Sequence, residues 1–227
     1  MQVKLQTVAV IGGTGAEGSG IALRLAHAGH RVIIGTRDPA KGAKIAAELN
    51  QELGTSTLGC QDNKRAAEAA DIVVLTVPYS AQVATVVAMR DALRGKILVD
   101  ATVPLIPPKV SRAQLPAGGS AVASVQAMLG DTVRVVSAFQ NVSAHKLRKL
   151  GADIDCDVLV CADDIEARRI VIDLVGTMGL RGIDAGPVCN SAAAEALASI
   201  LISINRKYKV PGSGIRITGM GEHAPSQ

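Results

Sequence analysis

The segment Val8-Ala-Val-Ile-Gly-Gly-Thr-Gly-Ala-Glu-Gly-Ser-Gly20 places a glycine-rich turn between an apolar run and a helical pattern. Residues 8–11 predict a buried strand, and the apolar spacing after the glycines predicts a helix. Gly13, Gly15 and Gly18 fit G-x-G-x-x-G. The first glycine makes a tight turn, the second lets the backbone approach a pyrophosphate, and the third lets helix and strand pack closely. The segment therefore predicts a dinucleotide site with the phosphates at the helix N-terminus.

The end of the next predicted strand, residues 31–36, favours NADP over NAD. An NAD site usually carries a carboxylate there to hold the ribose 2′-OH. Here the strand ends in Thr36 and Arg37, and Lys41 follows. A hydroxyl beside a guanidinium suits a 2′-phosphate, which arginine binds through two parallel hydrogen bonds. Asp38 leaves NAD as the alternative nucleotide, because a shift of one residue would aim its carboxylate at the ribose. The alternative is that Asp38, before a proline, is the N-cap of the next helix.

Apolar strand patterns alternate with helical patterns along the chain, which is typical of a parallel sheet covered on both faces. We expect an α/β fold, a Rossmann doubly wound parallel sheet with a smaller C-terminal α/β domain. Five prolines and glycines among residues 105–119 mark the boundary, so the domains are predicted as 1–112 and 113–227. The expected strands are 8–11, 31–36, 56–60, 72–77, 96–100, 134–139, 157–161 and 180–184, and the longer helices are 39–53, 80–93, 120–129, 165–178 and 191–206.

Composition excludes several classes of protein. No apolar run approaches the roughly 20 residues of a membrane span, and residues 1–4 lead straight into the first strand, so no signal peptide is expected. The four cysteines have neither C-x-x-C nor zinc spacing, which predicts reduced thiols, a cytoplasmic location and no metal. With three aromatic residues in the chain, little can stack on bases, so no nucleic-acid partner is expected.

The sequence lacks the acid that an ordinary carbonyl reductase needs to protonate the developing alkoxide. Neither tyrosine is followed four residues later by lysine, so the Tyr-x-x-x-Lys pair is absent, and the Lys-x-x-x-Asn pair is absent too. The four histidines stand in surface-type or terminal positions. Two explanations stay open: the chain transfers hydride to an acceptor that needs little acid–base help, such as a flavin-like ring, or it binds the nucleotide without catalysis.

A series of short motifs follows in a recognisable order: Gly12-Gly-Thr-Gly-x-x-Gly18, Gly35-Thr-Arg37, Leu75-Thr-Val-Pro78, Val135-Val-Ser-Ala138, Asp184-Ala-Gly-Pro187 with Asn190-Ser191, and Gly214-Ile-Arg-Ile217. Together they resemble the F420-dependent NADP oxidoreductases, also called NADPH-dependent F420 reductases. The resemblance implies hydride transfer between NADP(H) and the deazaflavin coenzyme F420. It also implies an NADP-binding Rossmann domain, a smaller acceptor-binding domain and a homodimer.

The resemblance assigns roles to residues of this chain. Thr14 would contact the pyrophosphate, and Thr36 and Arg37 the 2′-phosphate. The nicotinamide would be lined by Val77, Pro78, Val103 and Pro104. Asn190, Ser191 and the C-terminal segment would help hold the deazaflavin.

One position departs from the family pattern. Members often have a histidine shortly after Ser137-Ala138, where this chain has Phe139-Gln140. Gln140 can hydrogen-bond a ring carbonyl or nitrogen but cannot deliver a charged proton. The alternatives are therefore an NADPH-dependent reductase of flavin or of a small imine or carbonyl, and a non-catalytic NADPH-sensing protein.

Overall fold

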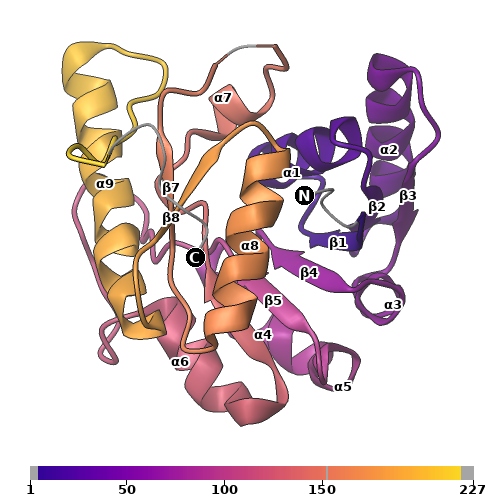
Figure 1. Ribbon diagram of the computed structural model, residues 1–227, viewed down its shortest axis with the longest axis horizontal. Coiled ribbons are helices and arrows are strands. Elements are labelled where there is room, and N and C mark those ends of the chain that lie inside the picture. The colour runs from indigo at the N-terminus through magenta and orange to yellow at the C-terminus, as the bar shows by residue number, and fades with distance from the viewer. Residues whose placement is uncertain (1–4, 152, 221–227) are drawn as a thin grey trace.

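The computed structural model describes residues 5–151 and 153–220, and its centre is a parallel six-stranded sheet (Figure 1). The strand order is β3-β2-β1-β4-β5-β6. The chain therefore builds outward from β1 to β3, returns to pair β4 with β1, and continues to the other edge. This reversal confirms the predicted doubly wound Rossmann sheet. The strands are β1 (Thr7–Ile11), β2 (Arg31–Gly35), β3 (Leu58–Gln61), β4 (Ile72–Leu75), β5 (Ile97–Asp100) and β6 (Arg134–Ser137).

Helices cover both faces of this sheet, because successive residues of each buried strand point to opposite sides. In β1, Val8 and Val10 face one apolar core, and Ala9 and Ile11 face the other. The first core is closed by α1 (Ala16–His27), α2 (Pro39–Leu53) and α8 (Ile165–Thr177). The second is closed by α3 (Asn63–Ala69), α4 (Tyr79–Ala88), α5 (Arg90–Leu93) and α6 (Ala121–Leu129).

The single helix predicted over residues 80–93 is wrong, since the structure has two helices there. Met89 separates α4 from α5 with φ −110° and ψ 7°, outside the helical region. Its side chain is buried in the second core. The apolar spacing continues through this break, so the pattern alone does not reveal it.

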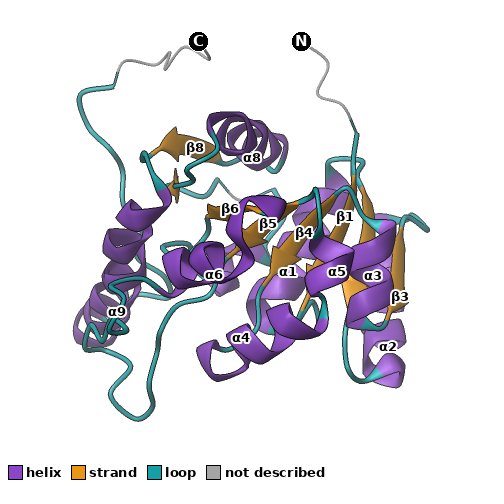
Figure 2. Cartoon of the chain, turned by 90° about the horizontal axis from the view of Figure 1, so that it is seen from below, coloured by secondary structure: helices purple, strands orange, loops and turns teal. Residues whose placement is uncertain are grey.

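The smaller C-terminal unit is a parallel pair of strands, β7 (Asp157–Val160) and β8 (Arg181–Asp184), connected through α8. Figure 2 shows β6, β5, β4 and β1 following one another across the molecule, with β8 and α8 drawn above β6 and β5 in this view. Strand β6 lies after residue 112 in the chain and yet completes the first sheet. The division into 1–112 and 113–227 stays a prediction.

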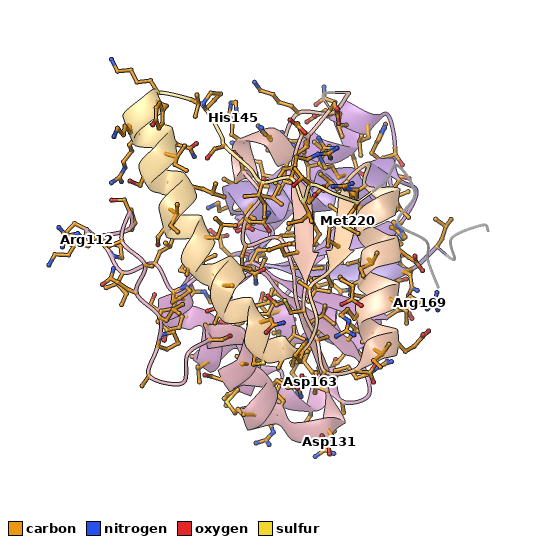
Figure 3. The ribbon with its side chains drawn as sticks, turned by 60° about the vertical axis from the view of Figure 1, so that its left-hand side comes forward. Arg112, Asp131, His145, Asp163, Arg169 and Met220 are labelled. Carbon is orange, nitrogen blue, oxygen red and sulfur yellow. The ribbon has the colours of Figure 1, made fainter. Side chains whose placement is uncertain are left out.

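Helix α9 (Ser191–Tyr208) lies at the side of the molecule opposite α2 and β3 (Figure 1). In Figure 3 this helix runs across the front of the molecule. With the turn before it, residues 188–208, it is long and apolar enough by length and composition to cross a membrane, which corrects the expectation that no segment is. Glu195 is 1% exposed on this helix. Its carboxylate accepts hydrogen bonds from Ser120 Oγ at 2.6 Å and from the Ala121 amide at 2.8 Å. These bonds dock α9 on the N-terminus of α6.

Helix α1 is tied to the C-terminal half by the buried guanidinium of Arg24. It donates hydrogen bonds to the carbonyl oxygens of Leu147 at 2.9 Å and Lys149 at 2.7 Å, at the end of α7 (Ala144–Leu147) and just beyond it. It also donates to the carbonyl of Met178 at 3.1 Å, at the end of α8. One side chain thus satisfies carbonyl groups that two helix ends leave free.

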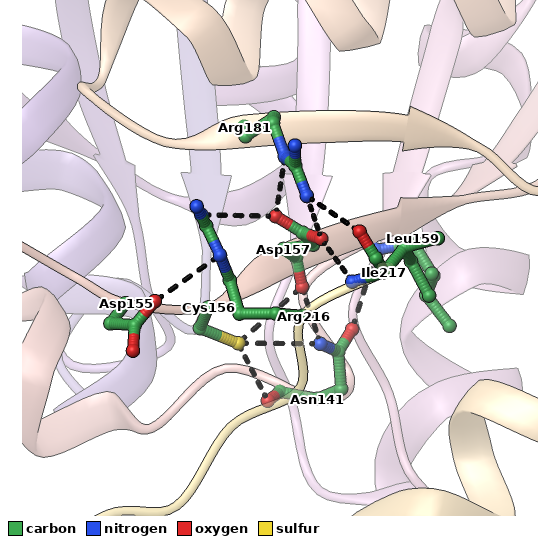
Figure 4. A network of polar contacts seen from close by, with 8 residues as sticks. All are labelled: Asn141, Asp155, Cys156, Asp157, Leu159, Arg181, Arg216 and Ile217. Carbon is green, nitrogen blue, oxygen red and sulfur yellow. Dashed lines mark hydrogen bonds and ion pairs between the residues drawn. The ribbon is translucent and has the colours of Figure 1, made fainter. Parts of the chain in front are cut away.

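The C-terminal segment is fixed by a second network, centred on the fully buried carboxylate of Asp157 (Figure 4). This carboxylate accepts from Arg181 Nε at 2.7 Å, from Arg216 Nη1 at 3.3 Å and from the Ile217 amide at 2.6 Å. Burial opposes ionisation, but the Arg181 and Ile217 hydrogen bonds, with the Arg181 and Arg216 charges, hold the pKa of Asp157 below its usual value. The segment is therefore fixed to the first residue of β7.

Helix α1 packs so closely on its neighbours that Gly18 has no room for a methyl group. A Cβ at Gly18 would lie 2.5 Å from Thr76 Oγ1 and 2.7 Å from the Gly12 carbonyl oxygen. Gly18→Ala should therefore lower the free energy of unfolding by about 2–3 kcal/mol, measured by chemical denaturation. Gly176→Ala is the matched control, because a Cβ there meets nothing within 4 Å inside α8. We expect the control to be neutral or stabilising by up to about 1 kcal/mol, and equal losses in both variants would contradict the packing argument.

The Asp157 network predicts a pH-dependent contribution to stability. Asp157→Asn should lower the free energy of unfolding by about 2–3 kcal/mol near neutral pH, since two arginines lose their partner beside a buried group. Because the pKa of folded Asp157 is depressed, its contribution is complete above about pH 4 and is lost as the pH falls through the folded value. Denaturation curves at pH 7 and pH 3 should therefore differ more in the wild type than in the variant.

Asp155→Asn is the control for that experiment, because Asp155 pairs with the same Arg216 at 3.2 Å but is 77% exposed. An exposed pair contributes little, so the change should stay within about 0.5 kcal/mol. Equal losses in the free energy of unfolding for Asp157→Asn and Asp155→Asn would show that burial of Asp157 does not strengthen its ion pairs.

Candidate functional site

A cleft of about 880 Å³ opens at the carboxyl ends of the central strands. It lies where the strand order reverses between β1 and β4, which is where open α/β sheets bind their ligands. Its walls come from the turn after β1, the first turn of α1, the end of β2 and the segments that follow β4 and β5. The lining residues that carry the argument are Thr14, Gly15, Glu17, Thr36, Arg37, Lys41, Val77, Pro78 and Val103.

The turn after β1 has the geometry of a phosphate cradle. A Cβ at Gly13 would meet the Val10 carbonyl oxygen at 2.8 Å, so this position forms the tight turn. At Gly15 a Cβ would meet only the Gly12 carbonyl oxygen, at 3.3 Å, and Gly15 with Thr14 lines the cleft. No side chain caps the N-terminus of α1 at Gly15. Its first amide groups therefore face the cleft without a side-chain partner, as an anion site requires.

Thr36, Arg37 and Lys41 all line the cleft at the end of β2. Asp38 is the N-cap of α2, and its carboxylate accepts a hydrogen bond from the Lys41 amide at 3.0 Å. The Thr36 hydroxyl accepts from the Asp38 amide at 3.1 Å. Of the two interpretations of Asp38, the structure confirms the helix cap. Two cationic side chains remain beside a hydroxyl, which is the chemistry that a 2′-phosphate requires.

The opposite end of the cleft has an apolar wall. Val77 and Pro78 follow β4, and Val103 follows β5, all three lining the cleft. Pro104, which the resemblance placed in the same wall, is buried and outside the lining. Such a wall suits one face of a flat ring.

The residues predicted to hold the acceptor are not among those that line this cleft. Gln140 is 5% exposed and donates from Nε2 to the Asp100 carbonyl oxygen at 2.7 Å. The Ser191 hydroxyl is buried 2.6 Å from that of Ser120, and Asn190 donates to the Ala185 carbonyl at 2.7 Å. The C-terminal segment contacts the start of β7, where the Asp157 amide donates to the Ile215 carbonyl oxygen at 2.8 Å. Residues 221–227, which belong to the same predicted segment, lie outside the described residues. The acceptor role of all these groups stays a prediction.

Two carboxyl groups at the site were not singled out from the sequence. Glu17 lines the cleft from the first turn of α1. Burial, and then the charge of Asp100, raise the pKa of Glu17 to about 8. Asp100 is fully buried at the end of β5, where its carboxylate accepts from Gln82 Nε2 at 2.7 Å and from the Thr102 amide at 2.9 Å. Burial also raises the pKa of Asp100. The available signals were the position of Glu17 inside the glycine motif and of Asp100 at a strand end.

No group of three or more histidine, cysteine, aspartate or glutamate side chains able to hold a metal ion occurs in residues 5–151 and 153–220. The four cysteines are free thiols.

Comparisons with known proteins identify the family to which this chain is similar. A family described as coenzyme F420-dependent NADP oxidoreductase matches residues 7–104. The F420-dependent NADP reductase of Methanocaldococcus jannaschii is 42% identical, over 94% of this chain and 98% of its own length. That of Methanothermobacter thermautotrophicus is 38% identical, over 98% of this chain and 99% of its own.

A solved structure gives the same result for the fold. The putative F420-dependent NADP reductase from Arthrobacter sp. FB24 superposes with a TM-score of 0.77 at 26% identity, covering 94% of this chain and 99% of that one. Near-complete coverage in both directions means that the sheet and the C-terminal unit are shared together. The resemblance seen in the sequence is confirmed: this chain belongs to the family of F420-dependent NADP reductases.

Proposed function

We propose that the cleft binds NADP(H) and that the chain transfers a hydride between it and F420. The observation that carries this proposal is one continuous cleft with an anion cradle in its middle, two cations at one end and an apolar wall at the other. This order matches the order of the groups along NADP: 2′-phosphate, pyrophosphate and nicotinamide. Family membership supports the choice of F420 as the other substrate.

The residues fit the nucleotide in a definite way. The first-turn amides of α1, with Thr14 and Gly15, would hold the pyrophosphate. Thr36, Arg37 and Lys41 would hold the 2′-phosphate by charge-assisted hydrogen bonds. Bound there, the nucleotide supplies or accepts the hydride at its nicotinamide ring.

The remaining task of the protein is to position the ring and exclude water. Val77, Pro78 and Val103 present apolar surface from two strand ends, so they would fix one ring face and keep solvent from the other substrate. Hydride transfer between two rings needs close and aligned approach more than a strong acid. This requirement explains how the chain can function without the tyrosine–lysine and lysine–asparagine pairs.

We also propose that two copies associate through α9. Its Ile200 is 50% exposed and its Tyr208 66% exposed, and Val210 beyond the helix is 40% exposed. Exposed apolar side chains on one long helix are typical of a subunit interface. The cytoplasmic location, and the absence of membrane and nucleic-acid partners, stay proposals that rest on the sequence.

The homodimer predicts a molecular mass in solution of twice 23.3 kDa. Light scattering on the purified chain measures this mass directly. Ile200→Asp should shift the population toward the single chain, because a carboxylate would be desolvated in the interface. A monomeric wild type would refute the proposal.

The function predicts that the purified chain oxidises NADPH when F420 is supplied, followed by the loss of the deazaflavin's visible absorbance. Arg37→Ala should raise KM for NADPH by about 30- to 150-fold, equivalent to about 2–3 kcal/mol for a lost charge-assisted contact. It should leave KM for NADH nearly unchanged, since NADH has no 2′-phosphate.

Lys44→Ala is the matched control, a cation on the nearby helix α2 that pairs at 4.0 Å with Glu48 and does not line the cleft. An equal effect of Arg37→Ala on both nucleotides would refute the 2′-phosphate assignment.

Turnover with riboflavin or an imine but not with F420 would favour an NADPH-dependent reductase of flavin or of a small imine. NADPH binding without any turnover would favour a non-catalytic NADPH-sensing protein.

A further inference from the structure

Two cations stand in a segment that borders the cleft and contains no acidic residue. Residues 105–119 follow β5 and include Lys109 and Arg112, but neither aspartate nor glutamate. Ile106 and Val110 of this segment line the cleft. The side chains of Lys109 and Arg112 are exposed and stand within two residues of Val110. They therefore place positive charge at the mouth of the cleft.

Hydrogen bonds inside the segment fix the position of these two cations. The Lys109 amide donates to the Ile106 carbonyl oxygen at 3.1 Å, and the Arg112 amide donates to the Lys109 carbonyl oxygen at 3.0 Å. The side chain of Gln114 donates from Nε2 to the same Lys109 carbonyl at 3.1 Å. These bonds close the segment into a turn and keep the two cations near each other.

A third cation, Arg206, comes from the last turn of α9. Its Nη1 donates a hydrogen bond to Ser111 Oγ at 3.3 Å, so Arg206 meets the segment between Lys109 and Arg112. Figure 3 shows Arg112 beside α9, directed away from the body of the molecule. The side chain of Arg206 is exposed as well. We call Lys109, Arg112 and Arg206 the basic patch.

The charge of the basic patch is not balanced by acidic residues of its own segments. Residues 196–220 contain no acid, and they add Lys207 and Lys209 just after Arg206. Among the described residues the patch takes part in no ion pair, whereas Arg169 on α8 pairs with carboxylates at 2.7 Å and 3.1 Å. Like charges held together repel one another, so an anion placed among them is attracted to all three.

The nucleotide does not account for this charge. Along the sheet edge the order is β2, β1, β4, β5. Arg37 and Lys41, which we assign to the 2′-phosphate, stand at the end of β2, and the phosphate cradle follows β1. The basic patch follows β5, beyond the apolar wall that Val103 helps to form. An anion at the patch therefore belongs to the substrate on the far side of the nicotinamide.

We propose that the basic patch binds the anionic tail of the second substrate. F420 carries its deazaflavin ring on a sugar-alcohol chain that ends in a phosphodiester and glutamate residues, so its tail is negatively charged at neutral pH. Lysine binds a phosphate as a point charge, and an arginine guanidinium matches phosphate or carboxylate oxygens with two parallel hydrogen bonds. This inference rests on the proposed function, because it takes F420 as the substrate at the apolar wall.

The basic patch is compatible with the dimer proposed through α9. At 3.6 residues per turn, Arg206 stands about 120° around the helix from Ile200. Ile200 is exposed, whereas the Arg206 side chain reaches toward residues 105–119. The two surfaces lie on different sides of one helix, so a second copy seated on Ile200 need not cover the patch.

Binding of two deazaflavins that differ only in the tail tests the proposal. The probes are F420 and the ribityl deazaflavin, which has the same ring and sugar-alcohol chain but neither phosphodiester nor glutamate. Fluorescence anisotropy of the oxidised deazaflavin, with the protein saturated with NADP⁺, gives each Kd without turnover. F420 should bind about 30-fold more tightly than the ribityl deazaflavin at about 0.05 M salt, and about threefold more tightly at about 0.5 M salt.

Variants of the basic patch should remove the preference for the tail. Lys109→Ala combined with Arg112→Ala should raise Kd for F420 about tenfold and leave Kd for the ribityl deazaflavin within about twofold. Lys109→Glu combined with Arg112→Glu should raise Kd for F420 about 30-fold or more, because the tail is then repelled. Arg206 stays in place in both variants, since its bond to Ser111 also holds the segment.

Arg31→Ala combined with Arg94→Ala is the matched control, because it removes the same charge from another part of the surface. Arg31 is the exposed first residue of β2, and the exposed Arg94 precedes β5. Both therefore stand at the amino ends of strands, away from the cleft at the carboxyl ends. We expect Kd for F420 to change by less than about twofold in this control.

The outcomes separate the patch from the proposed function. Equal Kd values for the two deazaflavins at low salt, or equal losses in the patch and control variants, would overturn the assignment of the tail and leave hydride transfer intact. Equal weakening of both deazaflavins by the patch variants would also overturn it, because the segment would then act on the ring. Binding of NADP⁺ but of neither deazaflavin would overturn the choice of F420 itself, and the inference with it.

Discussion

The close approach of α1 to the ends of β1 and β4 is the constraint on which the cleft depends. Gly18 packs against the Gly12 carbonyl and the Thr76 hydroxyl, and that hydroxyl is itself fixed by donating to the Ile11 carbonyl at 2.9 Å. The first turn of the helix is thereby held at the point where the strand order reverses. Its free amides, and the Glu17 side chain one residue earlier, face the nucleotide cleft for the same reason.

Much of the fold could be predicted because its signals are local. A parallel sheet with a nucleotide-binding turn is predicted by the apolar runs of β1, β2 and β4 and by the glycines after β1. The start of α2 is predicted by Asp38-Pro39. Pairing between distant segments has no such signal. The proline- and glycine-rich residues 105–119 mark a loop correctly, but nothing in them reveals that β6 pairs with β5 in register Asp100↔Ser137.

In the candidate site, too, some residues have a local signal in the sequence and others have none. Thr14, Thr36, Arg37 and Lys41 follow strand ends within motifs, and the structure brings them to one cleft. Gln140 and Ser191 are polar residues whose hydrogen bonds are made inside the protein, which adjacent sequence does not show. Glu17 and Asp100 were missed for a related reason. The ionisation of a carboxyl group depends on desolvation and on neighbours that come from other strands and helices.

The buried Arg24 has a consequence for how the two halves of the chain can move. Helix α1 presents the nucleotide cradle at its first turn. About two turns later, its Arg24 is hydrogen-bonded to the ends of α7 and α8. Rotation of the C-terminal unit about α1 would break the several charge-assisted hydrogen bonds that the buried Arg24 guanidinium donates to these carbonyl groups. We therefore expect cradle and C-terminal unit to behave as one rigid frame. Any adjustment to the size of the second substrate then falls to residues 105–119, the loop that borders the cleft at Leu105 and Ile106.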